Sequence, residues 1–573
     1  MRLHILFVAV CLGFSFLSNA QLDGNTTPTY HELIEMYKEL ADEHAEIELY
    51  SMGESDYGLP IYVCVLNGAQ DSLKTFEKAR SSTTLMVNNG IHPGEPDGIN
   101  ACLIWINDWI KAGKKTENLP VIGIIPAYNV GGMLNRSSSS RANQEGPEEY
   151  GFRGNAQNLD LNRDFIKMDS KNMFAFAKIF HALDPDAFID THVSNGADYQ
   201  YTLTYIASVR ERMAPSMAEL THDEFIPFMS QSLNEQEIDM ISYVNLVDDV
   251  PEKGMTIFND LPRYAMGYAA LFNTMSFTIE THMLKSFQNR TQATLSFLKC
   301  TIVWMSENSS RIEKARKDAF LSDAMTVDFP FDFQLTKQKD SIVFKGYEHS
   351  YPISEVTGLK RLKYHRDRPF EKYIPLYKTY EPARTAVIPD YYVVGGQCTD
   401  VLERLRANGV EMKLYIRDGE YTAFEQFRVN TFKSGKKPYE GHFLHSDINV
   451  ERVQLVAQFQ PMLKEGDYLI PTNQRRRRFL VSVLEPEMPD SYFAWNFFDS
   501  YVQQKEYFSS YVFEDKAAEL LAEDQELKDM FEKKKKEDEK FRENAWQQLY
   551  FIYKHSEFYE PTHNFLPIFR IVI

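Results

Sequence analysis

Residues 82–113, STTLMVNNGIHPGEPDGINACLIWINDWIKAG, contain the pattern that decides the fold. The apolar run at their start predicts a buried strand, and the apolar residues at their end predict a buried helix that stops at Gly113. His92 and Glu95 lie in the loop between them, where Pro and Gly exclude a regular helix. The stretch therefore predicts a strand that passes through a polar loop into a helix, as in α/β proteins.

The same alternation of strand and helix patterns continues from about residue 27 to residue 322. YHELIEMYKELADEH has helical spacing, whereas LPIYVCVLN, LPVIGIIPAYN, DAFIDTHVS and MSFTIETH are typical of strands. We therefore predict an α/β domain over residues 21–325, a sheet covered by helices on both faces that binds ligands beyond its strand ends. Shorter aromatic and charged segments follow, and they predict a β-rich domain over residues 326–573 with one long terminal helix near residues 514–550.

The first twenty residues, MRLHILFVAVCLGFSFLSNA, combine a basic start, an apolar centre and small residues at the end. This pattern is typical of a secretory signal peptide, so residues 1–20 are predicted to be removed before Gln21. We expect an exported protein, periplasmic or extracellular. No later apolar run reaches the ~20 residues that a transmembrane helix needs.

Composition excludes some classes of function. A chain of 573 residues with 43% hydrophobic and 25% charged residues is globular and too long for one ordinary core. Its net charge of -19 argues against nucleic acid as a partner, and the basic run at 475–478 is predicted to be a solvated hairpin end. Four cysteines outside the signal leave two alternatives open, one or two disulfides or buried free thiols; they are Cys64, Cys102, Cys300 and Cys398. The oligomeric state is also left open.

The His-x-x-Glu pattern at His92 and Glu95 is weak by itself. With 14 His and 81 acidic residues in 573 positions, such a pair is expected about twice by chance. A catalytic zinc ion needs three protein ligands and one open position, and His192 follows a buried strand at the end where sites of α/β proteins assemble. The alternatives are a solvated turn for the pair and a structural role for His192.

Two further segments are rich in groups suited to catalysis. In FRGNAQNLDLNRDF, residues 152–165, Arg163 can bind a carboxylate with two donors, Asn162 can add a neutral donor, and Arg153 can polarise a carbonyl. The alternative is a polar surface turn. In SFTIETH, Glu280 ends an apolar strand, where a lone carboxylate costs free energy unless it has a partner or a role.

Taken in order, these motifs resemble the zinc carboxypeptidase family of carboxypeptidases A and B. The spacing of nine positions between Arg153 and Asn162 is similar to that in the regulatory carboxypeptidase branch. The likeness covers roughly residues 28–300 and implies that family's mixed sheet. It also implies one Zn²⁺ per chain, held by His92, Glu95 and His192.

The resemblance implies roles for the other residues. It implies that Glu280 is the general base on a zinc-activated water and that Arg153 stabilises the oxyanion. Asn162 and Arg163 would bind the terminal carboxylate of the substrate, and Asp160 would accept a hydrogen bond from His92. Together they imply removal of residues from the C-terminal ends of peptides or proteins.

Some elements of the family's site are ambiguous in this chain. Either Tyr264 or Tyr268 could close over the substrate, and we predict Tyr268, twelve residues before Glu280. Arg141, in the Ser-rich insertion NRSSSSRANQEGPEEYG, is a lesser rival to Arg153. This insertion could reshape the site, so the preferred terminal residue is left open. No acidic residue is an obvious candidate for a basic-side-chain pocket, although Asp260 is close in sequence, and this disfavours a preference for lysine or arginine.

The sequence therefore predicts a secreted zinc metallocarboxypeptidase with a C-terminal domain of open role. One alternative is a zinc amidohydrolase of the same fold that acts on cell-wall peptides or acyl-amino acids. Another is a peptide-binding protein that has lost catalysis, which the joint presence of three ligands and Glu280 disfavours.

Overall fold

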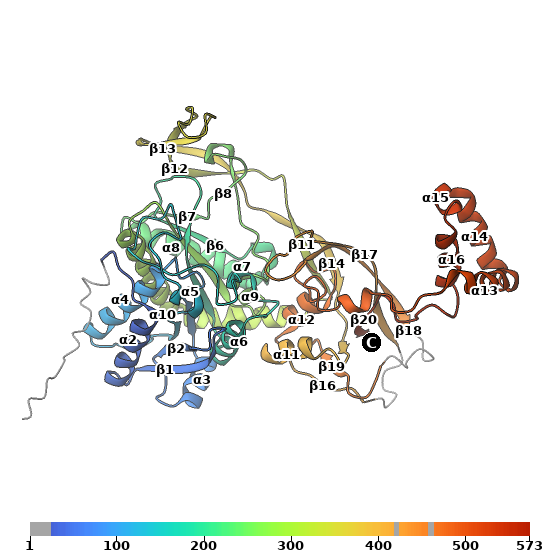
Figure 1. The fold of residues 1–573 in the computed structure, drawn as a ribbon. Coiled ribbons are helices and arrows are strands. Elements are labelled where there is room, and N and C mark those ends of the chain that lie inside the picture. Colours follow the sequence, from blue (N-terminus) through green and yellow to red (C-terminus); the bar gives the residue numbers. More distant parts are fainter. Residues whose placement is uncertain (1–23, 417–422, 456–462) are drawn as a thin grey trace, which may run out of the picture.

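The computed structural model describes residues 24–416, 423–455 and 463–573 (Figure 1). The predicted signal peptide lies outside these ranges. Within them, none of the helices combines the length and the apolar character that a bilayer span requires.

A mixed eight-stranded sheet forms the centre of the N-terminal region, in the order β1-β2-β4-β3-β5-β10-β6-β7. Four neighbouring strands, β4, β3, β5 and β10, run parallel, whereas β2 and β6 join them antiparallel. The strand bounds are β1 Ile47–Glu54, β2 Pro60–Leu66, β3 Thr84–Asn88, β4 Val121–Ile125, β5 Ala187–Ser194, β6 Leu203–Ala207, β7 Met240–Ser242 and β10 Met275–His282. All residues of β3, β4 and β5 are buried; β4 is wholly apolar, whereas β3 and β5 combine apolar residues with buried polar ones.

Helices cover both faces of this sheet, as predicted. A Cβ added to Gly98, in the first turn of α4, would clash with Thr191, whereas Phe176 of α6 packs on Phe188 with 5.8 Å between ring centroids. Thr191 and Phe188, both in β5, are an odd number of residues apart, so their side chains point to opposite faces of the sheet. The main helices are α2 Tyr30–Glu43, α3 Ser72–Ser81, α4 Asp97–Lys111, α6 Lys171–Leu183, α8 Ile226–Asn234, α9 Ala265–Ala270 and α10 Phe287–Met325.

Strands dominate the chain after α10. A six-stranded sheet has the order β16-β19-β15-β20-β17-β18, and β11 pairs with β14. The bounds are β11 Asp328–Leu335, β12 Asp340–Ser350, β13 Lys363–Tyr377, β14 Tyr380–Val387, β15 Tyr391–Val394, β16 Lys413–Leu414, β17 Phe424–Ser434, β18 His445–Leu455, β19 Tyr468–Pro471 and β20 Phe565–Ile571. Helices α11 (Thr399–Ala407) and α12 (Arg477–Leu484) pack with them. The β-rich second region is thus present.

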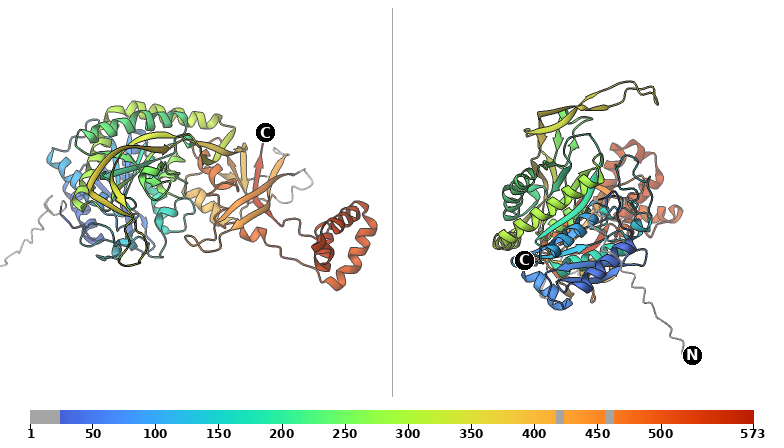
Figure 2. Two further views of the ribbon diagram at one scale, coloured as in Figure 1. Left: turned by 90° about the horizontal axis from the view of Figure 1, so that it is seen from above. Right: turned by 90° about the vertical axis from the view of Figure 1, so that its left-hand side faces the viewer.

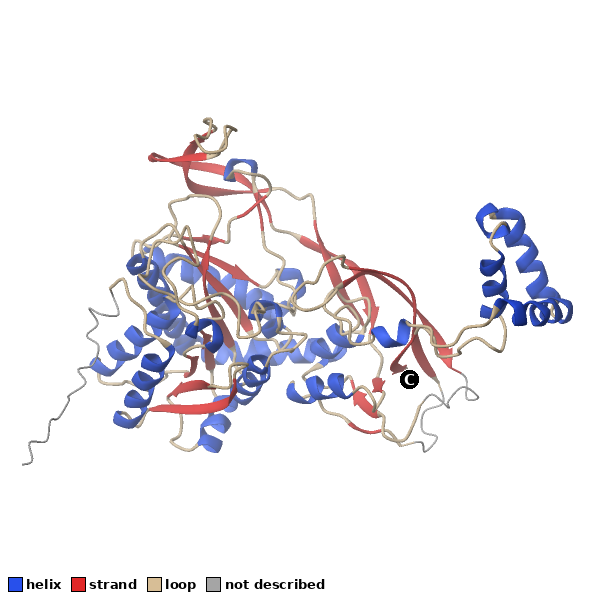
Figure 3. Ribbon diagram, in the orientation of Figure 1, coloured by secondary structure: helices blue, strands red, loops and turns tan. Residues whose placement is uncertain are grey.

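The β12–β13 hairpin packs on the N-terminal region through side chains such as Phe344, and its far end extends outward (Figures 1 and 3). At its base, β13 pairs with the short strand β9 (Met255–Thr256), which also pairs with β8 (Asn245–Leu246). The two regions therefore share a sheet. The division at residue 325 stays a prediction, although α10 ends at Met325.

The predicted long terminal helix is wrong. Four shorter helices replace it and form a separate small cluster: α13 Ser510–Glu523, α14 Gln525–Glu537, α15 Glu539–Arg542 and α16 Ala545–Lys554 (Figure 2). Asp524, Asp538 and Asn544 accept hydrogen bonds from the backbone N–H groups of the next helices. These N-caps end one helix and start another, because a cap residue has non-helical backbone angles.

The basic run at 475–478 is not a solvated hairpin end. It leads into α12 and joins the two regions, with Arg475 2.8 Å from Asp184 and Arg478 2.7 Å from Asp323. The hydrophobic core is also continuous there, because Phe479 stacks on Phe272 with 5.7 Å between ring centroids. Both observations show that α12 and the residues before it pack the C-terminal region against the N-terminal one.

The four cysteines in the described part of the chain are free thiols, and three of them are buried. Burial raises the pKa of Cys102 to about 12, so this thiol stays protonated and behaves as a small apolar side chain. Of the two alternatives for the cysteines, the structure favours free thiols over disulfides.

Candidate functional site

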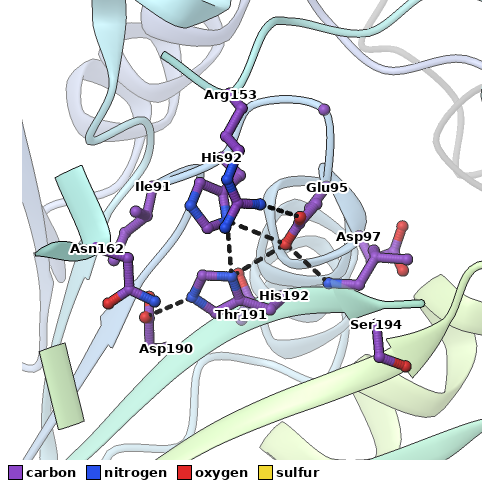
Figure 4. Close-up of polar contacts among 12 residues, drawn as sticks. Ile91, His92, Glu95, Asp97, Arg153, Asn162, Asp190, Thr191, His192 and Ser194 are labelled. Atoms are coloured by element: carbon purple, nitrogen blue, oxygen red, sulfur yellow. Dashed lines mark hydrogen bonds and ion pairs between the residues drawn. The ribbon is translucent and has the colours of Figure 1, made fainter. Parts of the chain in front are cut away.

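His92, Glu95 and His192 lie together at one edge of the central sheet (Figure 4). Strands β3 and β5 are parallel neighbours, so the loop that follows β3 meets the C-terminal end of β5. The two Nδ1 atoms of the histidines are 3.1 Å apart, and Glu95 Oε2 lies 2.9 Å from His192 Nδ1 and 3.3 Å from His92 Nδ1. All three side chains are buried.

The outer nitrogen of each imidazole faces a carboxylate. His92 Nε2 lies 2.9 Å from Asp160 Oδ1, and His192 Nε2 lies 2.6 Å from Asp190 Oδ2. Since a carboxylate accepts, these partners assign the hydrogen to Nε2 in both rings and leave a lone pair on each Nδ1. Two lone pairs and the Glu95 carboxylate then face one another in a buried space, an arrangement that repels unless a cation lies between them.

The donor atoms fit a zinc ion. Zinc–ligand bonds of ~2.0–2.1 Å in tetrahedral geometry place the donor atoms about 3.3 Å from one another. The observed separations of 2.9, 3.1 and 3.3 Å are of this size. Two histidines and one glutamate form a ligand set found in catalytic zinc sites, which keep the fourth position for water or substrate.

Arg141 orients Glu95. Its Nη1 lies 2.6 Å from Glu95 Oε1, and its other donors reach Gln144 Oε1 and the Val193 carbonyl oxygen. Burial by itself would raise the pKa of Glu95, but Arg141 and His92 hold this pKa well below its ordinary value. The carboxylate therefore stays charged, with Oε2 directed at the imidazoles.

Arg153 contacts the same group less closely. Its Nη1 lies 3.4 Å from Glu95 Oε1, its Nε donates to Asp160 Oδ2 at 3.0 Å, and its side chain is 46% exposed. Both arginines line the same cavity, but all three donor nitrogens of Arg141 have partners and the Arg141 side chain is less exposed than that of Arg153. This difference favours Arg153 over Arg141 as the residue that meets a substrate.

The loop that carries Asn162 and Arg163 begins at Asp160. Asp160 caps a short 3₁₀ helix, Leu161–Arg163, by accepting from the Asn162 N–H at 2.9 Å. Asn162 Oδ1 accepts from the Ala265 N–H at 3.1 Å, so the side-chain amide has a defined orientation. The Arg163 guanidinium lies 4.6 Å from the centre of the Tyr264 ring.

A cavity of about 200 Å³ connects these groups. Among its lining residues are seven of those predicted from the sequence: His92, Glu95, Arg153, Asn162, Arg163, His192 and Glu280. Glu280 is paired with His192 across β10 and β5. Burial raises the pKa of Glu280 to about 7, against the opposing effect of His192. Asp160 lies behind His92 rather than in the cavity.

Tyr268 does not belong to this cavity, which contradicts the prediction. It is fully buried among aromatic rings, and its hydroxyl donates to Asn408 Oδ1 at 2.6 Å. Tyr264, the alternative, lines the cavity instead. Tyr264 precedes α9 with extended backbone angles, and its ring packs against Phe258 and the Arg163 guanidinium. Tyr268 lies within α9 and faces the core.

A second cavity of about 470 Å³ adjoins the first and shares Ile206, Tyr243 and Phe258 with it. Ile342 of β12 and Leu376 of β13 also line this second cavity. The C-terminal region thus borders the cavity next to the candidate site.

Some residues of the site were not identified in the sequence. Asp190 was detectable, because it precedes His192 by two residues in a strand and therefore shares its face. Arg141 was considered only as a rival to Arg153. Tyr243 and Phe258 come from loops without a distinctive pattern, and nothing in the sequence near them indicated a role.

Comparison with known proteins gives distant relatives. No protein-family model matches the chain. Carboxypeptidase 2 of Trichophyton rubrum is 22% identical over 508 residues, which cover 82% of this chain and 84% of the relative. Carboxypeptidase 2 of Trichophyton equinum is 22% identical over 511 residues, with the same coverage.

Solved structures are similar over about half of the chain. A metallo-carboxypeptidase from Burkholderia cenocepacia aligns with a TM-score of 0.36 and 17% identity, over 49% of this chain and 70% of that one. Carboxypeptidase A from Helicoverpa armigera aligns with a TM-score of 0.38 and 15% identity, over 53% of this chain and 76% of that one.

Proposed function

We propose that this chain, a peptidase of the zinc carboxypeptidase family, removes C-terminal residues from peptides with one bound zinc ion. The similarity to curated carboxypeptidases over four fifths of the chain supports this proposal. The observation that carries it is the convergence of two imidazole lone pairs and the Glu95 carboxylate in a cavity that also contains Glu280 and Arg163. Membership of the regulatory branch stays a prediction.

His92, Glu95 and His192 would hold the zinc ion, which as a Lewis acid polarises a carbonyl group and makes water more acidic. Asn162 and Arg163 bind the terminal carboxylate of the substrate and so place its last peptide bond beside the metal ligands. A guanidinium suits this task because its donors match the two oxygens of a carboxylate. The free C-terminus is then a requirement for binding.

Glu280 acts as the general base. It takes a proton from the attacking water and later passes this proton to the leaving amine. A pKa of about 7 suits both steps, because the carboxylate gains and returns a proton near neutral pH. Arg153 donates to the oxygen of the attacked carbonyl, where negative charge develops.

Tyr264 takes the place that the sequence analysis gave to Tyr268. Its ring lies over Arg163 at the edge of the cavity, where it can cover the bound terminal residue. Burial raises the pKa of Tyr264, so its hydroxyl is neutral and can donate a hydrogen bond. We also propose that the protein is exported, on the strength of residues 1–20.

Metal content and product analysis test the proposal together. The purified mature protein should contain one zinc ion per chain and release single C-terminal residues from a mixed peptide library. A chelator should stop this release, and added zinc should restore it. Zinc without release from peptides, but with hydrolysis of acyl-amino acids, would favour the amidohydrolase instead. Absence of zinc from folded, metal-supplied protein would contradict the assignment of the three ligands.

A further inference from the structure

A tight turn of the C-terminal region contacts the candidate site. Tyr439 and His442 form a bridge in which their N–H groups donate to each other's carbonyl oxygens at 2.7 and 3.1 Å. Between them, Glu440 has a φ of 48° and Gly441 a φ of 86°. These angles correspond to a type I′ turn, in which Asn-Gly or Asp-Gly is the preferred central pair.

Glu440 is an unusual choice for this turn. A left-handed backbone suits glycine and asparagine, and a longer side chain adopts it at a cost in free energy. Strained backbone conformations of this kind are common at functional sites, which indicates a functional role for the Glu440 side chain.

The carboxylate of Glu440 binds the backbone of Asp160. Glu440 Oε2 accepts a hydrogen bond from the Asp160 N–H at 2.8 Å. The Asp160 side chain in turn lies 2.9 Å from His92 Nε2 and accepts from Arg153 Nε at 3.0 Å. Only one residue therefore separates Glu440 from a candidate metal ligand, although the contacting residues are 280 positions apart in sequence.

The turn is held in place on both sides. The Tyr439 ring stacks on Trp495 with 6.0 Å between centroids and an angle of 18°, and the Arg263 guanidinium lies within 6 Å of both rings. His442 Nε2 lies 2.7 Å from Asp169 Oδ2. Because the flanking residues are anchored, Glu440 presents its carboxylate from a fixed position.

We infer that Glu440 is a positioning residue through which the C-terminal region maintains the metal and carboxylate-binding site. This inference rests on the proposed function, because it assumes that the site binds zinc. A carboxylate that accepts from a backbone N–H makes a strong, charge-assisted hydrogen bond. Without this hydrogen bond the backbone of Asp160 is held less firmly. The orientation of His92 and the start of the segment that carries Asn162 and Arg163 then become less well defined.

Glu440→Gly separates this role from a contribution to stability. Glycine removes the hydrogen bond of the carboxylate, which destabilises the fold, and relaxes the left-handed turn, which stabilises it. Because these two effects oppose each other, the melting temperature of the metal-free full chain should change little. We expect zinc Kd, measured by competition with a chelator, to rise about 3- to 10-fold, less than the ~10- to 100-fold typical of direct partners of ligating histidines. KM for peptides should also rise.

Two further variants serve as controls. Glu440→Gln keeps an oxygen acceptor, so its zinc Kd should lie between those of the wild type and Glu440→Gly. Glu237 is an exposed glutamate at φ 60° that lines neither cavity, and Glu237→Gly should leave zinc Kd and KM unchanged. This matched substitution controls for the change in backbone freedom.

The outcomes are distinguishable from failure of the proposed function. If the wild type binds no zinc, the proposed function fails before Glu440 is tested. If the wild type binds zinc and Glu440→Gly binds it equally tightly, the inference is overturned. It is also overturned if Glu237→Gly weakens zinc binding as much, or if the loss in Glu440→Gly only follows a fall in melting temperature.

Discussion

Replacement of Asp190 by Asn tests whether the two imidazoles are oriented for a metal ion. Asp190 is fully buried, with Oδ2 2.6 Å from His192 Nε2, and Asn88 donates to its other oxygen at 3.2 Å. Asparagine keeps the shape and an acceptor but removes the charge. Hydrogen bonds to charged groups contribute ~1.5–3 kcal/mol and neutral ones ~0.5–1.5 kcal/mol, so about 1–1.5 kcal/mol is lost. Zinc Kd should therefore rise roughly 5- to 13-fold.

Chelator competition measures this Kd, and the zinc-dependent rise in melting temperature gives a second, independent readout. Asp160→Asn makes the same change at His92 and should have a smaller effect, because the Asp160 side chain is 13% exposed and that of Asp190 is fully buried. Asp223→Asn, in an exposed pair with Arg210, should change nothing. Wild-type zinc affinity in Asp190→Asn would refute the argument that the carboxylates hold the imidazoles for a metal.

Four further predictions concern catalysis and stability. Glu280→Gln should keep zinc but lower kcat by roughly 10²- to 10⁴-fold, as expected for loss of a general base; unchanged turnover of a peptide substrate would exclude Glu280 from that role. Arg163→Met should raise KM for peptides with a free C-terminus by about 10- to 100-fold, the equivalent of a charged hydrogen bond, and amidated peptides should be poor substrates of both enzymes. Tyr264→Phe should alter kcat/KM without lowering the melting temperature. Tyr268→Phe should lower the melting temperature, because it removes the hydroxyl that donates to Asn408. The reverse pattern in the two assays would assign the role at the site to Tyr268. Burial, assisted by Arg476, lowers the pKa of His181 from 6.5 to about 3, so the unfolded chain binds a proton more readily than the folded one. The free energy of unfolding should therefore decline as pH falls from about 6.5 toward 3. Denaturant titrations of His181→Gln should show a weaker decline over this range.

The C-terminal region is connected to the candidate site by specific contacts. Glu440 reaches Asp160, the β12–β13 hairpin borders the adjoining cavity, and α12 continues the core of the central sheet. These contacts give a physical reason to study the full chain rather than residues 21–325 alone. They also suggest why a role for this region is not evident from its own sequence, since its contribution depends on what it touches.

The sequence predicted the candidate metal ligands because their signals are local. His92 and Glu95 follow one strand closely, and His192 ends another, and parallel neighbouring strands bring such ends to the same edge of a sheet. Asp190 was available by the same reasoning, through the two-residue alternation of a strand. The cap residues that divide the terminal helix, such as Asp524 and Asp538, are also a local signal, because Asp is a preferred N-cap residue.

Other features depended on the tertiary structure. Which of Tyr264 and Tyr268 lines the cavity depends on where α9 begins and on the aromatic core that encloses the Tyr268 ring. The contact of Glu440 with Asp160 joins residues far apart in the chain, through a backbone angle that no local pattern predicts. The sequence by itself thus determined the sheet, its covering helices and the identity of the candidate ligands, because hydrophobic periodicity and strand ends are short-range properties. Only the tertiary structure decided which side chains orient those ligands and cover the cavity, because such contacts arise from packing between segments whose separation in sequence carries no information about their separation in space.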